Sequence, residues 1–356
     1  MKRFLLIFTV IFMVVCLSGC AFWMGGERVS VTPYQEHSTQ ADNALISVNT
    51  YNEMNKALVS LVESGAQRGI LTASSFSSGT LHYYVESAIN NIMKSNPIGA
   101  YAVERIDYEI GTNSGVPVIA FDIKYSVGRS EILGIKRVDT MDRARELVRT
   151  ALSYFDASVV LYVSNYSAED WVRFALDYAE KNPHIVIEIP EVTANVYPEG
   201  GKTRVVEMTF TYQTSSEKLK EMQNAVAPVF TSAELYVMET AEVKEIYSRL
   251  YSFLMERNKY TIESSITPVY SLLHQGVGDS RAFADVYAEM CRRAELDCQT
   301  ITGTRDGAVW SWNVVRYRGA YYHVDLLRCY EEGKFQLFRA NDTVNYEWDY
   351  TAFPAE

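Results

Sequence analysis

Two consecutive stretches of the chain follow the same order of helices and strands, and this repetition restricts the fold more than any other feature. Apolar periodicity predicts helix, strand, helix, strand, strand at 51–64, 69–74, 80–94, 103–110 and 117–125, and again at 141–154, 158–164, 168–180, 185–196 and 203–212. Asn-Pro ends the second helix in both stretches, and Tyr125 and Tyr212 of the closing strands lie 87 positions apart. The pattern favours a duplicated α/β unit of about 85–90 residues; two unrelated α+β segments are the alternative.

Neither unit contains a motif with a known chemistry. A glycine-rich phosphate loop, a nucleophile motif and a His pair with metal spacing are all absent from both sequences. We therefore expect the units to bind or to act as spacers, and we predict no cofactor and no metal site.

The amino terminus has the layout of a secretory signal. Lys2 and Arg3 precede the apolar run 4–17, which is shorter than the ~20 residues that a spanning helix needs. Leu17-Ser18-Gly19-Cys20 follows and resembles a bacterial lipobox. That resemblance implies cleavage after residue 19 and lipidation of Cys20 with two or three acyl chains such as palmitate, which is what stable anchoring requires. The alternative is an ordinary signal peptide with a chance cysteine. Residues 20–48 are expected to form a tether.

The charge balance limits the partners. Loss of Lys2 and Arg3 with the signal leaves 31 basic against 44 acidic residues, a formal charge of −13. No basic stripe is left to neutralise phosphates, which argues against nucleic acid. We expect an extracytoplasmic protein attached to a bacterial cell membrane, or to an outer membrane where one exists, through its amino-terminal lipid.

The last third of the chain has a different pattern. A helix is expected at 232–257, with a buried stripe of Leu235, Met238, Val243, Ile246, Leu250 and Phe253. The motifs after it are, in order, Gly276-Val277-Gly278-Asp279-Ser280, a helix at 281–295, Thr302-Gly303, Trp310-Ser311-Trp312-Asn313, Tyr321-Tyr322-His323-Val324-Asp325 and a closing strand at 335–339. In this order they resemble the transglutaminase-like superfamily, a papain-related fold, over roughly the last 90–120 residues.

The resemblance implies a triad of cysteine, histidine and acid, and this sequence departs from it. The register that keeps the helix's apolar positions in phase places the cysteine position on Ser280; an ungapped match would place it on Gly278. The histidine position falls on Trp310, and the acid is retained as Asp325. A serine hydroxyl needs a general base, and an indole N–H donates a hydrogen bond but cannot accept a proton. The set Ser280, Trp310 and Asp325 is therefore not expected to act as a triad.

Other residues supply alternatives. His323 shares a strand face with Asp325, so it is the one imidazole that could serve Ser280 if that face lines the cleft. A candidate binding cleft consists of Ser280, Trp310, Trp312, Asn313, His323 and Asp325. The mature chain keeps Cys291, Cys298 and Cys329. Small buried thiols are expected there, with a Cys298–Cys329 bridge as the alternative.

These observations predict an α+β protein. Its parts are a signal peptide at 1–19, a lipidated cysteine and tether at 20–48, α/β units with antiparallel strand pairs at 49–135 and 136–230, and a transglutaminase-like domain at 231–356. The favoured function is an inactive transglutaminase-like module on the cell surface that binds an envelope peptide, a glycan or a protein. An envelope hydrolase or acyltransferase using Ser280 is the second hypothesis, and a structural spacer is the third.

Overall fold

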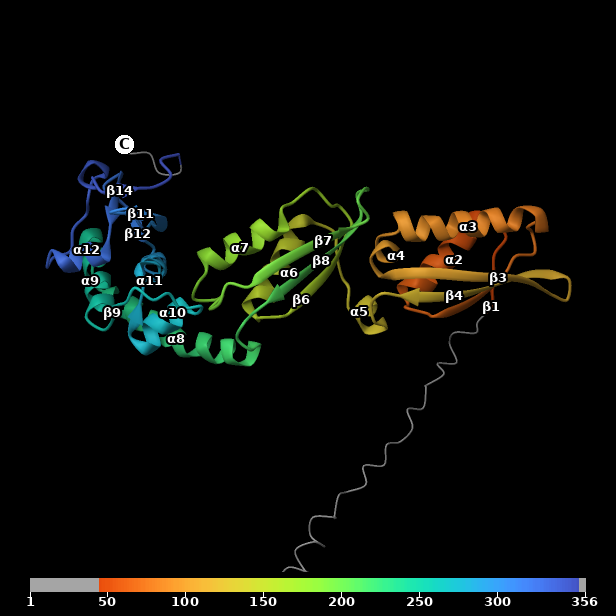
Figure 1. Ribbon diagram of the computed structural model, residues 1–356, viewed down its shortest axis with the longest axis horizontal. Helices are drawn as coiled ribbons and strands as arrows, with labels where there is room; N and C mark the ends of the chain where they lie inside the picture. Colours follow the sequence, from red (N-terminus) through yellow and green to blue (C-terminus); the bar gives the residue numbers. More distant parts are fainter. Residues whose placement is uncertain (1–44, 352–356) are drawn as a thin grey trace, which may run out of the picture. The chain divides into compact units, whose positions relative to one another are not determined.

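The computed structural model describes residues 45–351 (Figure 1). The predicted signal peptide, Cys20 and most of the predicted tether lie outside these residues. Within the described part, no helix is both long enough and apolar enough to cross a bilayer.

The first unit is a four-stranded sheet with helices on one face (Figure 1). Its strands are β1 (Leu45–Ser47), β2 (Arg68–Thr72), β3 (Val103–Asn113) and β4 (Val116–Tyr125), in the spatial order β1-β2-β4-β3. Only the β1–β2 pair is parallel. The helices are α2 (Tyr51–Glu63), α3 (Ser78–Ser95) and the short α4 (Pro97–Ala102). Apolar side chains of both layers meet in one core, which includes Leu58 and Leu71.

The second unit has the same topology. Its strands are β5 (Lys136–Val138), β6 (Ser158–Val163), β7 (Glu191–Tyr197) and β8 (Arg204–Thr211), in the order β5-β6-β8-β7 with β5 and β6 parallel. The helices α6 (Met141–Ser153) and α7 (Trp171–Lys181) pack on this sheet, and α5 (Arg129–Leu133) precedes it. The two units therefore share strand order, strand direction and helix placement, as a duplicated unit requires.

A local signal fixes the first helix of each unit. The Thr50 hydroxyl accepts a hydrogen bond from the Glu53 backbone N–H, and Thr140 does the same for Arg143, both at 3.2 Å. A threonine at this position satisfies one of the backbone donors that a helix start leaves free.

The predicted strand 185–196 starts too early. β7 begins at Glu191, and residues 183–188 form turns and bends. Val186 and Ile187 are nevertheless buried, each 1% exposed. Burial of a loop segment thus produced the apolar run, and Pro190, which lacks a backbone N–H, separates that segment from the strand.

The predicted helix 232–257 is two helices, α8 (Ser216–Val237) and α9 (Val243–Met255). Leu235 and Met238 are 61% and 71% exposed, so the predicted buried stripe is wrong at its start. Leu250 and Phe253 are buried as expected. The apolar pattern continued across the break between the helices, and that continuity concealed the helix end.

In the carboxyl-terminal domain, α11 (Ser280–Arg293) packs against a fully antiparallel sheet, unlike the mixed sheets of the first two units. Its strands are β11 (Cys298–Arg305), β12 (Ala308–Tyr317), β13 (Ala320–Val324) and β14 (Tyr346–Glu347), all antiparallel in the order β13-β12-β11-β14. The short elements around it are α10 (Pro268–Tyr270), the π-helical turn Ser271–Gln275, the strand pair β9 (Lys259–Tyr260) and β10 (Val277–Gly278), α12 (Leu326–Glu331) and the 3₁₀ turn Ala340–Asp342.

Two tight turns set the β11–β12–β13 hairpins. Asp306 and Gly307 both have positive φ, as do Arg318 and Gly319, which is the geometry that favoured two-residue hairpin turns require. The predicted closing strand at 335–339 contributes only one bridge, between His323 and Phe338, and the sheet closes at β14 instead.

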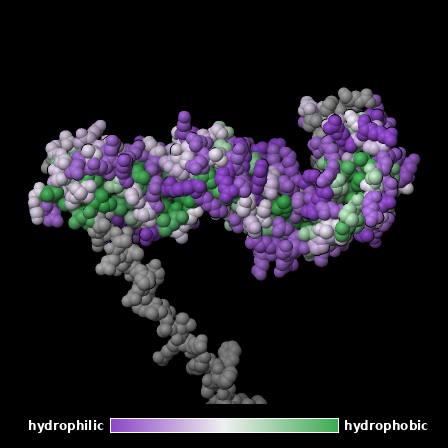
Figure 2. Space-filling model, turned by 180° about the vertical axis from the view of Figure 1, so that it is seen from behind, coloured by the Kyte–Doolittle hydropathy of each residue, from purple (hydrophilic) through white to green (hydrophobic). Residues whose placement is uncertain are grey.

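The sheet separates two cores. One lies between the sheet, α11, α8 and α9. It includes Leu219 and Phe230 of α8, a helix that runs without a break from Ser216 to Val237. The predicted domain start at residue 231 thus falls inside a helix that packs with the carboxyl-terminal core. The smaller core on the opposite sheet face contains Trp312 and Tyr346. Polar and charged residues cover most of the surface in Figure 2.

Candidate functional site

Ser280 is the first residue of α11. The helix is capped by Asp279, whose carboxylate accepts the Ala282 backbone N–H at 2.9 Å and the Ser264 hydroxyl at 2.5 Å. The Ser280 Oγ accepts a hydrogen bond from the Ser311 backbone N–H of β12 at 3.2 Å. The hydroxyl is half-buried and directed at the strand that carries Trp310.

The alternative nucleophile position, Gly278, is packed tightly. A Cβ at this residue would lie 2.9 Å from the Ala282 Cβ and 3.1 Å from the Leu272 Cδ1. A cysteine side chain would require these neighbours to shift, whereas Ser280 carries its side chain without such a clash. The packing therefore favours the register through Ser280.

Trp310 and Asp325 meet directly. The Trp310 indole Nε1–H donates to the Asp325 Oδ2 at 2.9 Å. Asp325 is 3% exposed and follows the last residue of β13. The structure thus places a donor-only side chain on the carboxylate that, by the family resemblance, would orient the base.

Further donors occupy the same carboxylate. The Tyr346 hydroxyl donates to Oδ2 at 2.7 Å and the Arg305 guanidinium at 3.3 Å, while Oδ1 caps α12 by accepting the backbone N–H groups of Leu327 and Arg328. Burial, reinforced by the charge of Asp325, raises the pKa of Tyr346, which keeps its hydroxyl protonated as a donor.

An aromatic ring and a guanidinium group pack against the Trp310 indole. The Tyr260 ring lies 5.5 Å from the Trp310 ring, and the Arg305 Cζ lies 5.2 Å from the Trp310 ring centroid. Arg305 also forms an ion pair of 2.6 Å with Glu331. These contacts hold the indole in one orientation. Sequence spacing gave no signal for Arg305 and Tyr346, because the strand pair of β11 and β14 is what brings them to Asp325.

His323 is held elsewhere. Its Nδ1 accepts a hydrogen bond from the Trp312 Nε1–H at 2.9 Å, and its ring packs on Trp348. Burial lowers the pKa of His323 to about 4, so the imidazole is neutral at pH 7. The lone pair that a general base would use is already engaged.

The remaining candidate cleft residues are enclosed. Trp312 is 1% exposed and Asn313 is 0% exposed, and the Asn313 amide donates to the Ala284 backbone carbonyl at 2.8 Å. Neither side chain offers a surface to a ligand, since both are packed between elements of the domain. Of the two tryptophans in the candidate cleft, Trp310 is partly exposed to solvent and Trp312 is buried.

The three described cysteines are free and buried. Burial raises the pKa of Cys329 to about 12 and raises that of Cys291 as well. Such thiols are poor nucleophiles. Cys298 and Cys329 form no bridge. Among residues 45–351, no group of His, Cys, Asp and Glu is suited to hold a metal ion.

Comparison with known proteins gives one family match, and it lies in this domain. Residues 231–326 match the family model of the transglutaminase-like superfamily. No curated protein matches the chain.

Solved structures similar to the chain include a transglutaminase (9% identity, TM-score 0.27) covering 54% of this chain. A second is a putative cysteine protease from Cytophaga hutchinsonii, with 12% identity, a TM-score of 0.27 and 44% of this chain covered. A third is a putative protease from Parabacteroides distasonis, with 7% identity, a TM-score of 0.24 and 72% of this chain covered. The chain spans 59%, 70% and 39% of these three structures, respectively. Together with the motifs and their order in the fold, the family match shows that this chain contains a transglutaminase-like domain, at residues 231–326.

Proposed function

We propose that the protein is a cell-envelope lipoprotein whose transglutaminase-like domain is catalytically inactive and serves as a binding module. One observation carries this proposal: the indole of Trp310, which the family resemblance aligns with the family's base, donates its N–H to Asp325 at 2.9 Å. An indole has no lone pair that could accept a proton from a nucleophile.

The chemistry of Ser280 supports the same conclusion. A serine hydroxyl has a far higher pKa than a thiol, so attack on a carbonyl requires a base to remove its proton. The described hydrogen bond of Ser280 is to a backbone N–H, a donor, and not to a base. His323 is the one imidazole of the candidate set, and its Nδ1 already accepts a hydrogen bond from the Trp312 indole. The hypothesis of a Ser280 hydrolase or acyltransferase therefore lacks a base.

The envelope location rests on the amino-terminal sequence. Lys2 and Arg3, the apolar run 4–17 and the Leu17–Cys20 lipobox are together typical of a lipoprotein precursor. A mass spectrum of the mature amino terminus tests this part. We expect a diacylglyceryl-modified Cys20 as the first residue; an unmodified cysteine or an intact signal would contradict the anchor.

Activity-based labelling tests the inactive domain. The full-length protein in detergent micelles, incubated with a fluorophosphonate probe, is expected to stay unlabelled, as is Ser280→Ala. Labelling of the parent but not of Ser280→Ala would overturn the proposal.

A reconstruction provides the positive control. Ser280→Cys alone is expected to react with iodoacetamide no faster than an ordinary exposed thiol. Adding Trp310→His places an imidazole between the new thiol and Asp325, and such an arrangement lowers a thiol pKa. The double variant is therefore expected to react faster at pH 6 than the single variant.

Ligand binding separates a module from a spacer. Soluble peptidoglycan fragments titrated into the full-length protein are expected to bind, and Trp310→Ala is expected to weaken that binding. Failure of the fragments, and of extracted envelope peptides, to bind the parent protein would favour the spacer hypothesis.

A further inference from the structure

β11 has an open edge. In the sheet order β13-β12-β11-β14, β14 covers only Thr304 and Arg305 of β11. Within the described residues, the segment 298–302 has no strand beside it on that side. It spans about 17 Å at ~3.4 Å per residue.

Alternation of the backbone shows which groups face this edge. The Asp297 carbonyl accepts the Arg316 N–H on the β12 side at 3.1 Å, whereas the Asp306 N–H donates to the Asn345 carbonyl on the β14 side at 2.9 Å. In an antiparallel strand the direction of the backbone groups alternates from residue to residue. The N–H and C=O groups of Cys298, Thr300 and Thr302 therefore face the open edge. No backbone hydrogen bond within residues 45–351 joins these groups to another residue.

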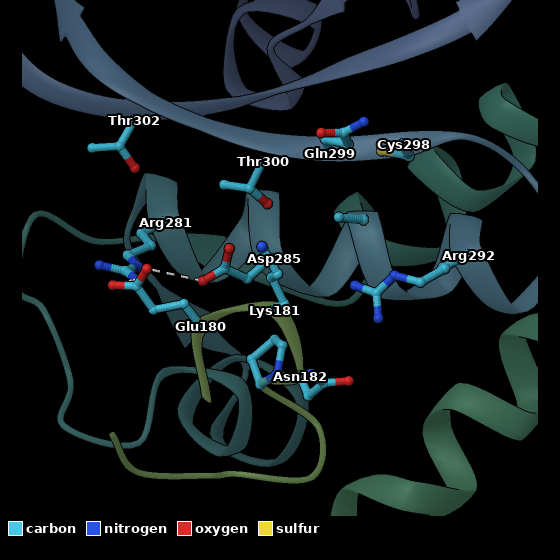
Figure 3. A pocket seen from close by; sticks show the side chains of 12 residues that line it. Glu180, Lys181, Asn182, Arg281, Asp285, Arg292, Cys298, Gln299, Thr300 and Thr302 are labelled. Atoms are coloured by element: carbon cyan, nitrogen blue, oxygen red, sulfur yellow. Dashed lines mark hydrogen bonds and ion pairs between the residues drawn. The ribbon is translucent and has the colours of Figure 1, made fainter. Parts of the chain in front are cut away.

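A cavity lies along the same segment (Figure 3). Its volume is about 490 Å³, within the range of roughly 300–1,000 Å³ typical of ligand sites. β11 forms one wall with residues 298–300 and Thr302, α11 forms another, and the end of α7 with Asn182 and Pro183 forms the third. In Figure 3 the side chains of Thr300 and Thr302 project from β11 toward Asp285 and Arg281 of α11.

The charges around this cavity are unequal. Its basic residues are Lys181, Arg281 and Arg292, and its acidic residues are Glu180 and Asp285. Arg281 forms ion pairs of 3.4 Å with both Glu180 and Asp285, so a single cation is shared by the two carboxylates. Arg292 forms an ion pair of 2.5 Å with Glu289, whereas Lys181 has no ion pair within residues 45–351. Burial also raises the pKa of Asp285 to about 6, which reduces its negative charge in mildly acidic surroundings.

We propose that the open edge of β11 and this cavity bind an extended acidic peptide segment, which adds to the sheet as a strand in line with β14. Backbone groups at Cys298, Thr300 and Thr302 supply the pairing, as in other cases of strand addition. Lys181, the cavity's cation without an ion pair among the described residues, meets the acidic side chains that alternate toward the cavity. An open strand edge left without blocking proline or inward lysine is competent for such pairing.

This inference goes beyond the proposed function. The edge lies on the β14 side of the sheet, whereas Trp310 and Asp325 belong to β12 and to the end of β13. Peptide pairing at β11 would hold whether or not Ser280 has activity.

Fluorescence anisotropy with defined peptides tests the proposal. The probe is fluorescein-labelled Glu-Thr-Glu-Thr-Glu-Thr with a blocked carboxyl terminus, added to the full-length protein in detergent micelles. We expect saturable binding below about 1 mM, weakened at least tenfold when alternate peptide nitrogens are methylated to remove their donors. The lysine counterpart, Lys-Thr-Lys-Thr-Lys-Thr, is expected to bind at least tenfold more weakly.

Two protein variants locate the site. Lys181→Glu is expected to weaken binding about tenfold, while the control Lys244→Glu, the same change at an exposed position of α9, leaves it unaltered. Thr300→Pro removes a donor that faces the open edge and no β12 ladder bond, so the fold should persist by circular dichroism while binding is lost.

Several results would overturn the proposal: no binding of the acidic peptide, equal binding of the methylated or the lysine peptide, or Lys181→Glu behaving as Lys244→Glu does. The methylated and lysine peptides keep the test decisive even if Thr300→Pro fails to fold, because they require only the parent protein.

Discussion

Replacing Asp325 by alanine tests whether this carboxylate now serves the fold alone. Its two oxygens receive five donors, and the side chain is 3% exposed. The donors are the Trp310 indole at 2.9 Å, the Tyr346 hydroxyl at 2.7 Å, the Arg305 guanidinium at 3.3 Å, and the N–H groups of Leu327 and Arg328 at 3.0 and 3.2 Å. Asp325→Ala removes this acceptor from all five donors.

The magnitude follows from these partners. Loss of the α12 cap costs about 1 kcal/mol. Each buried donor left unsatisfied costs ~1–3 kcal/mol, and the Tyr346 hydroxyl and the Trp310 N–H are two such donors. Arg305 keeps its ion pair with Glu331, so the guanidinium adds little. The expected total is about 3–7 kcal/mol, and removal of one partner of a buried charged pair costs ~3–5 kcal/mol.

Urea unfolding followed by tryptophan fluorescence measures this loss, since Trp310, Trp312 and Trp348 all belong to the domain. Asp170→Ala is the matched control, because Asp170 caps α7 from an exposed position and accepts the Arg173 N–H at 2.9 Å. The control is expected to lose about 1 kcal/mol. Equal losses in the two variants would refute the structural role assigned to the Asp325 cluster.

Three further predictions concern the same domain. The pKa of His323 is about 4 in the folded protein and ~6.5 when unfolded, so the unfolded state takes up the extra proton. Stability should therefore fall as the pH drops from about 6.5 to about 4, and His323→Gln should flatten the urea midpoint over that window; an unchanged slope would contradict the burial argument. Gly303→Ala would place a Cβ 2.1 Å from the Glu347 carbonyl and 2.9 Å from the Trp312 ring, so a loss of ~1–3 kcal/mol is expected. The control Gly79→Ala, with open space around its Cβ, should not destabilise, and equal thermal midpoints would count against the clash. The thiols of Cys291, Cys298 and Cys329 should react with Ellman's reagent only after unfolding, and reaction of the native protein on the scale of seconds would refute their burial.

Local signals made the repeated unit predictable. Each first helix begins one residue after a threonine cap, Thr50 or Thr140, and apolar periodicity identified the helix that follows. The prediction was wrong where buried apolar residues lie outside a regular helix or strand. Val186 and Ile187 are buried in a loop, and the apolar pattern ran on from α8 into α9 across a break. Hydrophobic periodicity reports burial, and it reports a strand or a helix only when the backbone is also paired.

The candidate site divides in the same way. Motif spacing predicted Ser280, Trp310 and Asp325 as the family's site positions, and the structure brings the last two into contact. The partners Arg305 and Tyr346 were missed, because β14 reaches β11 through a loop whose path no local pattern specifies. The open edge of β11 was missed for a related reason: it exists only because β14 stops after two residues, and an absent neighbour leaves no trace in the sequence.

Retention of Asp325 is therefore no argument for catalysis in this chain. A carboxylate that orients a histidine and one that anchors a tryptophan both need a buried position and a ring N–H donor, and Trp310 supplies that donor. The indole keeps the hydrogen bond that the site's geometry depends on, while removing the second ring nitrogen that proton transfer needs. In the function that we propose, this exchange keeps the hydrogen bond to Asp325 and removes the base. Asp325 now holds Trp310, Tyr346 and the start of α12 together, and stability, not turnover, is what its loss should change.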